Sequence, residues 1–221
     1  MSTAHPTSLA HQFDSLEQQK ESANLGMWLF LAQEILFFGG LFAAYMLYRW
    51  RDPEAFAAGS HELDITLGLI NTVILIASSL TMALGVHAAQ TNKTRALVRW
   101  MLATGGLGLA FLVIKYFEYS AKWHHHLIPG PNFHFDPPIG GRAEMFFSLY
   151  FAMTGMHALH MIVGIAILAW LLPRAARGTY NAEYHNPIEC FGLYWHFVDI
   201  VWIFLFPMLY LIGRHYHAVG G

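Results

Sequence analysis

Residues 145–172 read MFFSLYFAMTGMHALHMIVGIAILAWLL, a stretch that contains no Asp, Glu, Lys or Arg. A helix of about 20 apolar residues crosses the roughly 30 Å hydrocarbon core of a bilayer, so this stretch can cross it with a tilt or a short extension. A helix also pairs its own backbone groups, whereas a lone strand would leave them unpaired in lipid. The stretch therefore predicts a transmembrane helix.

Four further segments have the same character. They are residues 26–48, 65–88, 96–119 and 191–212, which are bounded by charged residues, prolines or polar turns. Together with residues 145–172 they predict an all-α, polytopic membrane protein, a bundle of five transmembrane helices. We expect a polar N-terminal segment over residues 1–25, a single membrane domain over residues 26–213 and a short C-terminal tail over residues 214–221.

The composition also suits a chain surrounded by lipid. Hydrophobic residues make up 56% of the chain and charged residues 12%, which is about half the charged fraction of a soluble domain. The formal net charge of −2 gives no basic footprint for nucleic acid. The polar residues 1–20 lack the apolar core of a secretory signal peptide. The single cysteine, Cys190, excludes an internal disulfide.

Lysine and arginine residues in the loops predict the orientation in the membrane. With the N-terminus inside, the inner side holds Lys20, Lys93, Arg95, Arg99, Arg174 and Arg177. The outer side then holds Arg49, Arg51, Lys122, Arg142 and Arg214. This small excess favours an N-terminus inside and a C-terminus outside, since an odd number of spans puts the termini on opposite sides.

Glu34, Lys115 and Glu118 are charged residues within the first and third predicted spans. Glu34 lies about two turns into the first span, where an ionisable group costs at least a few kcal/mol. Nothing in that helix neutralises Glu34, so it should face protein or a polar cleft. It is either a neutral acid bonded to a neighbouring helix or a group that handles protons or contacts lipid head groups. Lys115 and Glu118 share one face of the third span and predict an interfacial ion pair.

The last two spans each carry a polar pair at i, i+3 spacing. These pairs are His157 with His160 in the fourth span and His196 with Asp199 in the fifth, the latter flanked by Trp195 and Trp202. An acid beside a histidine can hold a tautomer or share a proton. We favour polar links between packed helices over a metal site, because lipid offers such groups no other partner. The spacing also permits a haem held by two histidines of these spans, whereas residues 124–126, three consecutive loop histidines, would bind metals only adventitiously.

Four motifs, in order, resemble those of subunit III of the haem–copper oxidases. Residues 28–34 (WLFLAQE) and 37–42 (FFGGLF) are similar to that family's Glu-bearing helix, and Asn71-Thr72 with Ser78-Ser79 is similar to its next helix. Residues 154–160 (TGMHALH) followed by Gly164 are similar to its histidine segment, and residues 194–202 (YWHFVDIVW) to its Trp-His-Phe-Val-Asp signature. The resemblance covers about residues 28–210.

The resemblance implies an accessory subunit with no haem, copper or catalytic residue of its own. Such a subunit packs against catalytic subunit I in a complex that also contains subunit II, binds phospholipid and supports proton uptake. The complex reduces O₂ to water and pumps protons. We accordingly expect a multi-pass protein of a bacterial plasma membrane. We expect a proton- or lipid-associated role for Glu34, His157 and His160, and a helix-packing or assembly role for Trp195, His196, Asp199 and Trp202.

The resemblance leaves several alternatives. Cytochrome c oxidase is the expected complex, but five-span members also occur in quinol oxidases and among relatives linked to nitric oxide reductase. Seven-span members have two further helices before the Glu-bearing one, so a partner would have to supply the missing wall of their lipid cleft. From other classes, a haem-binding membrane cytochrome and a small ion carrier using Glu34 and the buried histidines are the alternatives.

Overall fold

The computed structural model describes residues 11–137 and 139–211. Its helices are α1 (Leu16–Arg51), α2 (Pro53–His61), α3 (Ile65–Gln90), α4 (Thr94–His124), the 3-10 turn η1 (Gly140–Ala143), α5 (Glu144–Ala176), α6 (Asn186–Phe206) and the π turn η2 (Pro207–Leu211). Five segments are long and apolar enough to cross a membrane, namely α1, α3, α4, η1 with α5, and α6 with η2. The described residues include no β-strand. The predicted all-α, five-span fold class is therefore confirmed.

The helices extend beyond the predicted apolar spans. α1 begins at Leu16, where the Ser15 hydroxyl oxygen accepts a hydrogen bond of 3.1 Å from the Gln18 N–H. This is an ordinary N-cap, and it places the polar residues before Gly26 in the same helix as the span. Residues 212–221, which include the predicted tail, lie outside the described part of the chain. The division of the chain into an N-terminal segment, a membrane domain and a C-terminal tail therefore stays a prediction.

A short helix, α2, lies in the connection that the sequence analysis treated only as a loop. Asp52 caps it by accepting a hydrogen bond from the Ala55 N–H, and Pro53 occupies its first turn. A Cβ atom added at Gly59 would lie 2.3 Å from the Phe146 ring. The absence of a side chain at Gly59 thus lets α2 pack closely against the start of α5.

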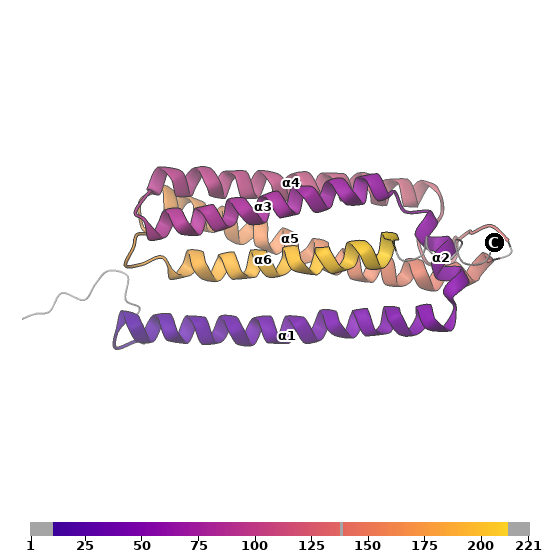
Figure 1. The fold of residues 1–221 in the computed structure, drawn as a ribbon, viewed down its shortest axis with the longest axis horizontal. Coiled ribbons are helices and arrows are strands. Elements are labelled where there is room, and N and C mark those ends of the chain that lie inside the picture. Colours follow the sequence, from indigo (N-terminus) through magenta and orange to yellow (C-terminus); the bar gives the residue numbers. More distant parts are fainter. Residues whose placement is uncertain (1–10, 138, 212–221) are drawn as a thin grey trace, which may run out of the picture.

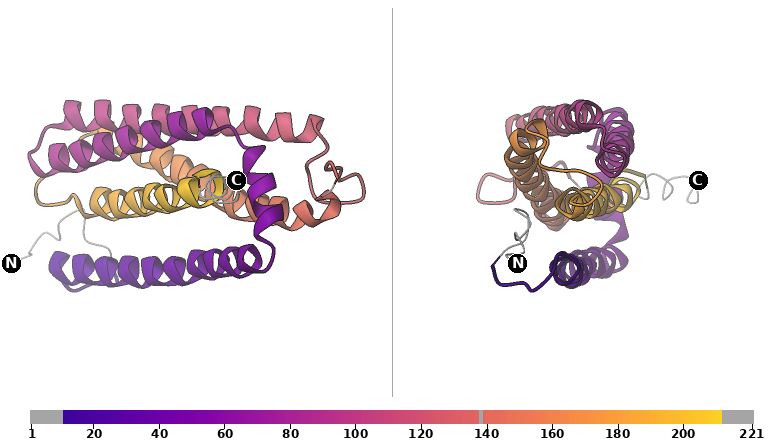
Figure 2. Two further views of the ribbon diagram at one scale, coloured as in Figure 1. Left: turned by 45° about the vertical axis from the view of Figure 1, so that its right-hand side comes forward. Right: turned by 90° about the vertical axis from the view of Figure 1, so that its left-hand side faces the viewer.

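The long helices form a group of four, α3 to α6, with α1 at its side. Figure 1 shows α1 running along one side of the other four, and the end-on view in Figure 2 shows the same separation. α1 reaches the group through contacts with α5 and α6. In the most apolar 18-residue stretch of α6 with η2, 56% of the residues are buried, against 17% in that of α1. α6 is therefore the central helix, and α1 is a side helix whose few inward-facing residues hold it in place.

Two polar ties hold the C-terminal half of α1. The Tyr45 hydroxyl donates a hydrogen bond of 2.8 Å to the Met208 carbonyl in η2. The Arg142 Nε donates one of 2.8 Å to the Asp52 carboxylate, just after α1. This hydrogen bond lowers the pKa of Asp52, although the Arg142 side chain is half exposed. Exposed ion pairs contribute little to stability, so the buried Tyr45 is the more important tie.

Candidate functional site

Glu34 has a partner on another helix. Its carboxyl oxygen Oε2 lies 3.1 Å from the Nε2 atom of His160 on α5. Only 8% of the Glu34 surface is exposed, and it is one of the four buried residues of α1. The structure thus places Glu34 facing protein, as the sequence analysis expected, and supplies the neutralising group that α1 itself lacks.

The hydrogen bonds of His160 indicate where protons lie in this pair. Its Nδ1 atom is 2.9 Å from the Met156 carbonyl oxygen, which can only accept, so Nδ1 carries a hydrogen. The contact between Nε2 and Glu34 then needs one more proton, on either the histidine or the acid. In both cases the pair as a whole is neutral. A neutral pair that holds one transferable proton is compatible with burial beside lipid, whereas a lone carboxylate is not.

Aromatic groups enclose the Glu34–His160 pair. The Phe38 ring, one turn after Glu34, lies 5.2 Å from the His160 ring. The Tyr194 hydroxyl on α6 donates a hydrogen bond of 2.7 Å to the His160 carbonyl. The site therefore lies where α1, α5 and α6 meet, and the pair is the polar link that holds α1 at mid-span.

His157 does not belong to this pair. Its side chain is fully buried between the rings of Phe111 on α4 and Trp202 on α6, with ring centroids 5.3 and 5.2 Å away. Neither ring nitrogen has a hydrogen-bond partner among the residues that the structure describes. The i, i+3 spacing suggested a shared site for His157 and His160, but the two side chains have separate surroundings.

His196 and Asp199 do not bond to each other in the structure. The His196 Nδ1 atom lies 2.7 Å from the Ser79 hydroxyl on α3, and His196 also borders a groove next to Trp28 of α1. Asp199 is 2% exposed, and neither of its carboxyl oxygens has a partner within the described chain. The proton-sharing pair that the spacing suggested is therefore absent from these residues.

The two tryptophans of the same motif make inward hydrogen bonds. Trp195 Nε1 donates to the Ser78 hydroxyl and Trp202 Nε1 to the Thr72 hydroxyl, each at 3.1 Å. Both indole rings are fully buried. They lie where α6 packs on α3, the position that a helix-packing role requires.

The Lys115–Glu118 pair is present but buried, not interfacial. The Lys115 Nζ atom donates to Glu118 Oε2 at 2.8 Å, and both residues are 3% exposed. Tyr150 on α5 and Tyr210 in η2 both donate to Glu118 Oε1, and Nζ also donates to the Tyr210 hydroxyl. The two tyrosines were not anticipated from the sequence; the available signal was a hydroxyl-bearing residue near the start of the fourth span and another near the end of the fifth.

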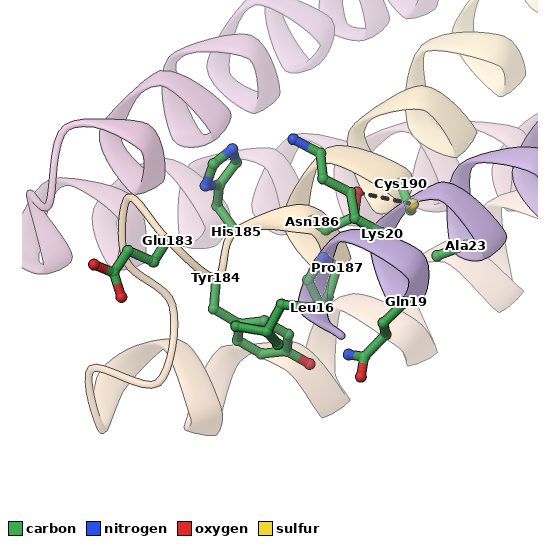
Figure 3. Close-up of a pocket in the computed structure, with 10 residues that line it drawn as sticks. All are labelled: Leu16, Gln19, Lys20, Ala23, Glu183, Tyr184, His185, Asn186, Pro187 and Cys190. Carbon is green, nitrogen blue, oxygen red and sulfur yellow. Dashed lines mark hydrogen bonds between the residues drawn. The ribbon is translucent and has the colours of Figure 1, made fainter. Parts of the chain in front are cut away.

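A pocket lies where the first turns of α1 meet the start of α6. Figure 3 shows the residues that line it, which include Leu16 and Lys20 of α1, Tyr184 of the loop between α5 and α6, and Cys190 of α6. Its volume is about 260 Å³ and its surface is mostly apolar. It brings together no group of catalytic side chains.

The histidine-rich segments do not form a metal centre in the described part of the chain. Across residues 11–137 and 139–211, no three His, Cys, Asp or Glu side chains are placed to hold one metal ion. His125 and His134 border one surface hollow together with Asp136 and Glu62, but they do not converge. The ring nitrogens of His160 are both engaged, and His157 is enclosed by aromatic rings.

These features define a polytopic membrane protein with buried polar links between helices. Comparison with known proteins gives the family. The family model for cytochrome c oxidase subunit III matches residues 11–214. The chain is 34% identical to the cytochrome c oxidase subunit 3 of Thermostichus vulcanus, covering 91% of this chain and 92% of the relative. The chain belongs to the cytochrome c oxidase subunit III family, as its motifs suggested.

Two other relatives have different names. The chain is 32% identical to a probable quinol oxidase subunit 3 of Staphylococcus epidermidis, covering 94% of this chain and 97% of that protein. It is 31% identical to the heme-copper oxidase subunit I+III of Aeropyrum pernix, covering 87% of this chain but 23% of that longer protein. The relatives thus carry the names of cytochrome c oxidase, quinol oxidase and heme-copper oxidase subunits, and the last of these names joins subunits I and III.

Proposed function

We propose that this chain is the accessory subunit III of a respiratory haem–copper oxidase and packs directly against subunit I. The match to the family over residues 11–214 carries this proposal. The Aeropyrum relative supports the contact, because its name joins subunits I and III in one protein. Through subunit I the chain would also belong to a complex with subunit II, in a bacterial plasma membrane.

We further propose that this chain binds no haem or copper and that phospholipid is its ligand. The geometry of the histidines supports the first part. A haem between α5 and α6 would need an open cavity beside a histidine ring nitrogen, but both ring nitrogens of His160 are bonded, and the His157 ring is enclosed by the rings of Phe111 and Trp202. The apolar outer surface of α1 supports the second part, since large side chains such as Leu36 and Leu47 are more than half exposed.

Cytochrome c is the proposed electron donor of the complex, rather than quinol. The matching relatives named cytochrome c oxidase subunit 3 from Thermostichus and Synechocystis are 34% and 36% identical to this chain, and two others with that name are 31% and 32% identical. The quinol oxidase relatives are 29–32% identical. The electron donor binds to other subunits of the complex. The identity of those partner subunits therefore determines whether the donor is cytochrome c or quinol.

Purification of the complex in a gentle detergent tests the function. We expect this chain to co-purify with a large haem- and copper-containing subunit and with phospholipid, and to be colourless when separated from them. Labelling of a cysteine at Asn92, in a Cys190→Ser background, from the cytoplasmic side only would support the orientation favoured by the loop charges. Stoichiometric haem on the separated chain, lost in His157→Ala or His196→Ala, would replace this function with that of a cytochrome.

Glu34 is expected to affect how long the oxidase works and not whether it works. In Glu34→Gln the amide can still donate to His160 Nε2, so α1 stays in place, but the pair loses its transferable proton. We expect a nearly unchanged initial rate of oxygen reduction and a shortened lifetime during turnover. Glu34→Ala also removes the link, and loss of a buried hydrogen bond costs about 1–3 kcal/mol, so subunit retention should fall as well.

The control for this comparison is Gln33→Ala. Gln33 neighbours Glu34 in the same helix but is exposed, so its replacement should leave lifetime and retention unchanged. Initial rate, turnover lifetime and subunit retention are measured for all three variants. An immediate and complete loss of oxygen reduction in an intact Glu34→Gln complex would contradict an accessory role.

A further inference from the structure

Within the described part of the chain, three buried polar side chains of the α3–α6 group lack a hydrogen-bond partner. Asn71 on α3 and His157 on α5 are fully buried, and Asp199 on α6 is 2% exposed. Both side-chain polar atoms of each residue lack a hydrogen bond to any residue in the part of the chain that the structure describes. We call these three residues the unpaired cluster. Such groups are rare in native proteins, and each calls for a specific explanation.

Trp202 lies where the three helices that carry the unpaired cluster meet. Its ring centroid lies 5.2 Å from that of His157, and it follows Asp199 by three residues, on the same face of α6. Its Nε1 donates to Thr72, the residue next to Asn71 on α3. The three residues therefore lie on three helices, α3, α5 and α6, that meet around Trp202.

The neighbouring polar groups are engaged with other partners in the structure. Ser78 and Ser79 lie beside the Asp199 carboxyl, but Ser78 donates to the Leu75 carbonyl and accepts from Trp195, while Ser79 bonds to His196. Lys115, a nearby cation, donates to Glu118 and Tyr210. The local protein groups thus already have partners, and those of the cluster do not.

Burying polar side chains without hydrogen-bond partners is energetically costly. Each buried polar group without a partner costs about 1–3 kcal/mol, and lipid around the bundle cannot supply hydrogen bonds. The ligand that fits has to donate to the Asp199 carboxyl, both donate to and accept from the Asn71 amide, and complement either tautomer of His157. Water does all three, and buried waters bonded to otherwise unsatisfied groups are a regular part of protein interiors.

We propose that Asn71, His157 and Asp199 form a water-binding site inside the α3–α6 group. Ordered water molecules complete the hydrogen bonds that the protein leaves open and link three helices through one polar layer. The site is separate from the Glu34–His160 pair and does not depend on the complex in which the chain works. In this proposal, His157 helps to link α3, α5 and α6 through water, and it takes no part in the link between α5 and α1.

Substitution of Asp199 distinguishes a hydrated cluster from a dry one. Asp199→Asn keeps groups that bond to water, whereas Asp199→Leu is similar in size and apolar. In a hydrated site, Leu leaves the water, Asn71 and His157 short of hydrogen bonds. We then expect the equilibrium constant for loss of this chain from the complex to rise about 5- to 140-fold for Leu, and to change much less for Asn. In a dry cluster, Leu would remove an unpaired group and strengthen retention, which would overturn the proposal.

Two further measurements accompany these variants. Met82→Leu, a fully buried apolar exchange elsewhere on α3, is the control for a change of packing alone and should leave retention unchanged. A high-resolution map of the unaltered complex decides the matter even if Asp199→Leu fails to assemble. Density within hydrogen-bonding distance of all three side chains is the expected result. Direct bonds among the three side chains, or a dry contact in a map that shows other internal waters, would overturn the proposal.

Discussion

Replacing Lys115 with Met is expected to prevent stable assembly of the helix bundle. Lys115 and Glu118 are each 3% exposed, and the Nζ atom also lies 4.7 Å from the centroid of the Trp202 ring. Removing one partner of a buried ion pair leaves the other charge uncompensated, which costs about 3–5 kcal/mol. The same change frees Tyr210, which accepts a hydrogen bond from Lys115. This loss is a large part of the total stability of a typical domain.

A double variant separates charge from packing. Lys115→Met with Glu118→Gln removes both charges while keeping an acceptor for Tyr150 and Tyr210, so it should recover most of the loss. Arg142→Met is the matched control, because its ion pair with Asp52 is half exposed and should contribute little to stability. The measurement is the amount of this chain in the membrane and its thermal dissociation from the complex. Equal levels of the unaltered chain and Lys115→Met would contradict the structural role of the pair.

The five spans could be predicted because their cause is local. Each crossing needs a continuous apolar stretch of about 20 residues, and composition alone reveals such a stretch. The position of Glu34 on the protein-facing side of α1 was also predictable, since a lone carboxylate in lipid is too costly. Its partner His160 could not be predicted, because it lies 126 residues away in the chain. The apolar pattern of one helix does not show which face of another helix it will meet.

The polar pairs at i, i+3 spacing show the limit of a local rule. The rule places two residues on one face, but in a bundle one face can meet two different neighbours. His196 bonds to Ser79 beside the groove next to α1, whereas Asp199, one turn later, points to the interior. The same limit applies to Lys115 and Glu118. Their spacing predicted the pair, but the packing of α5 and η2 over them determined its burial.

Trp195 is the packing centre of the four-helix group. Its side chain is fully buried, and it contacts each of the other three helices. The indole lies against Gly108 on α4 and Gly164 on α5, where an added Cβ atom would come within 2.9 and 3.0 Å of it. On α3 it bonds to Ser78. Two glycines thus make the space that one tryptophan fills, and both sides of this contact should be sensitive to change.

Trp195→Ala is therefore expected to destabilise the chain by about 3–5 kcal/mol, the usual cost of truncating a large buried aromatic side chain. The cavity would lie between α4, α5 and α6, and Ser78 would lose its donor. Trp195→Phe should cost less, because it keeps most of the ring volume. Trp123→Ala is the control, since Trp123 is 68% exposed.

Gly164→Leu tests the same contact from the opposite side and should destabilise the chain by about 1–3 kcal/mol through overpacking. Thermal dissociation of each variant from the complex gives the order of these effects. If Trp195→Ala behaves like Trp123→Ala, the four helices are held together elsewhere and α6 is not their centre.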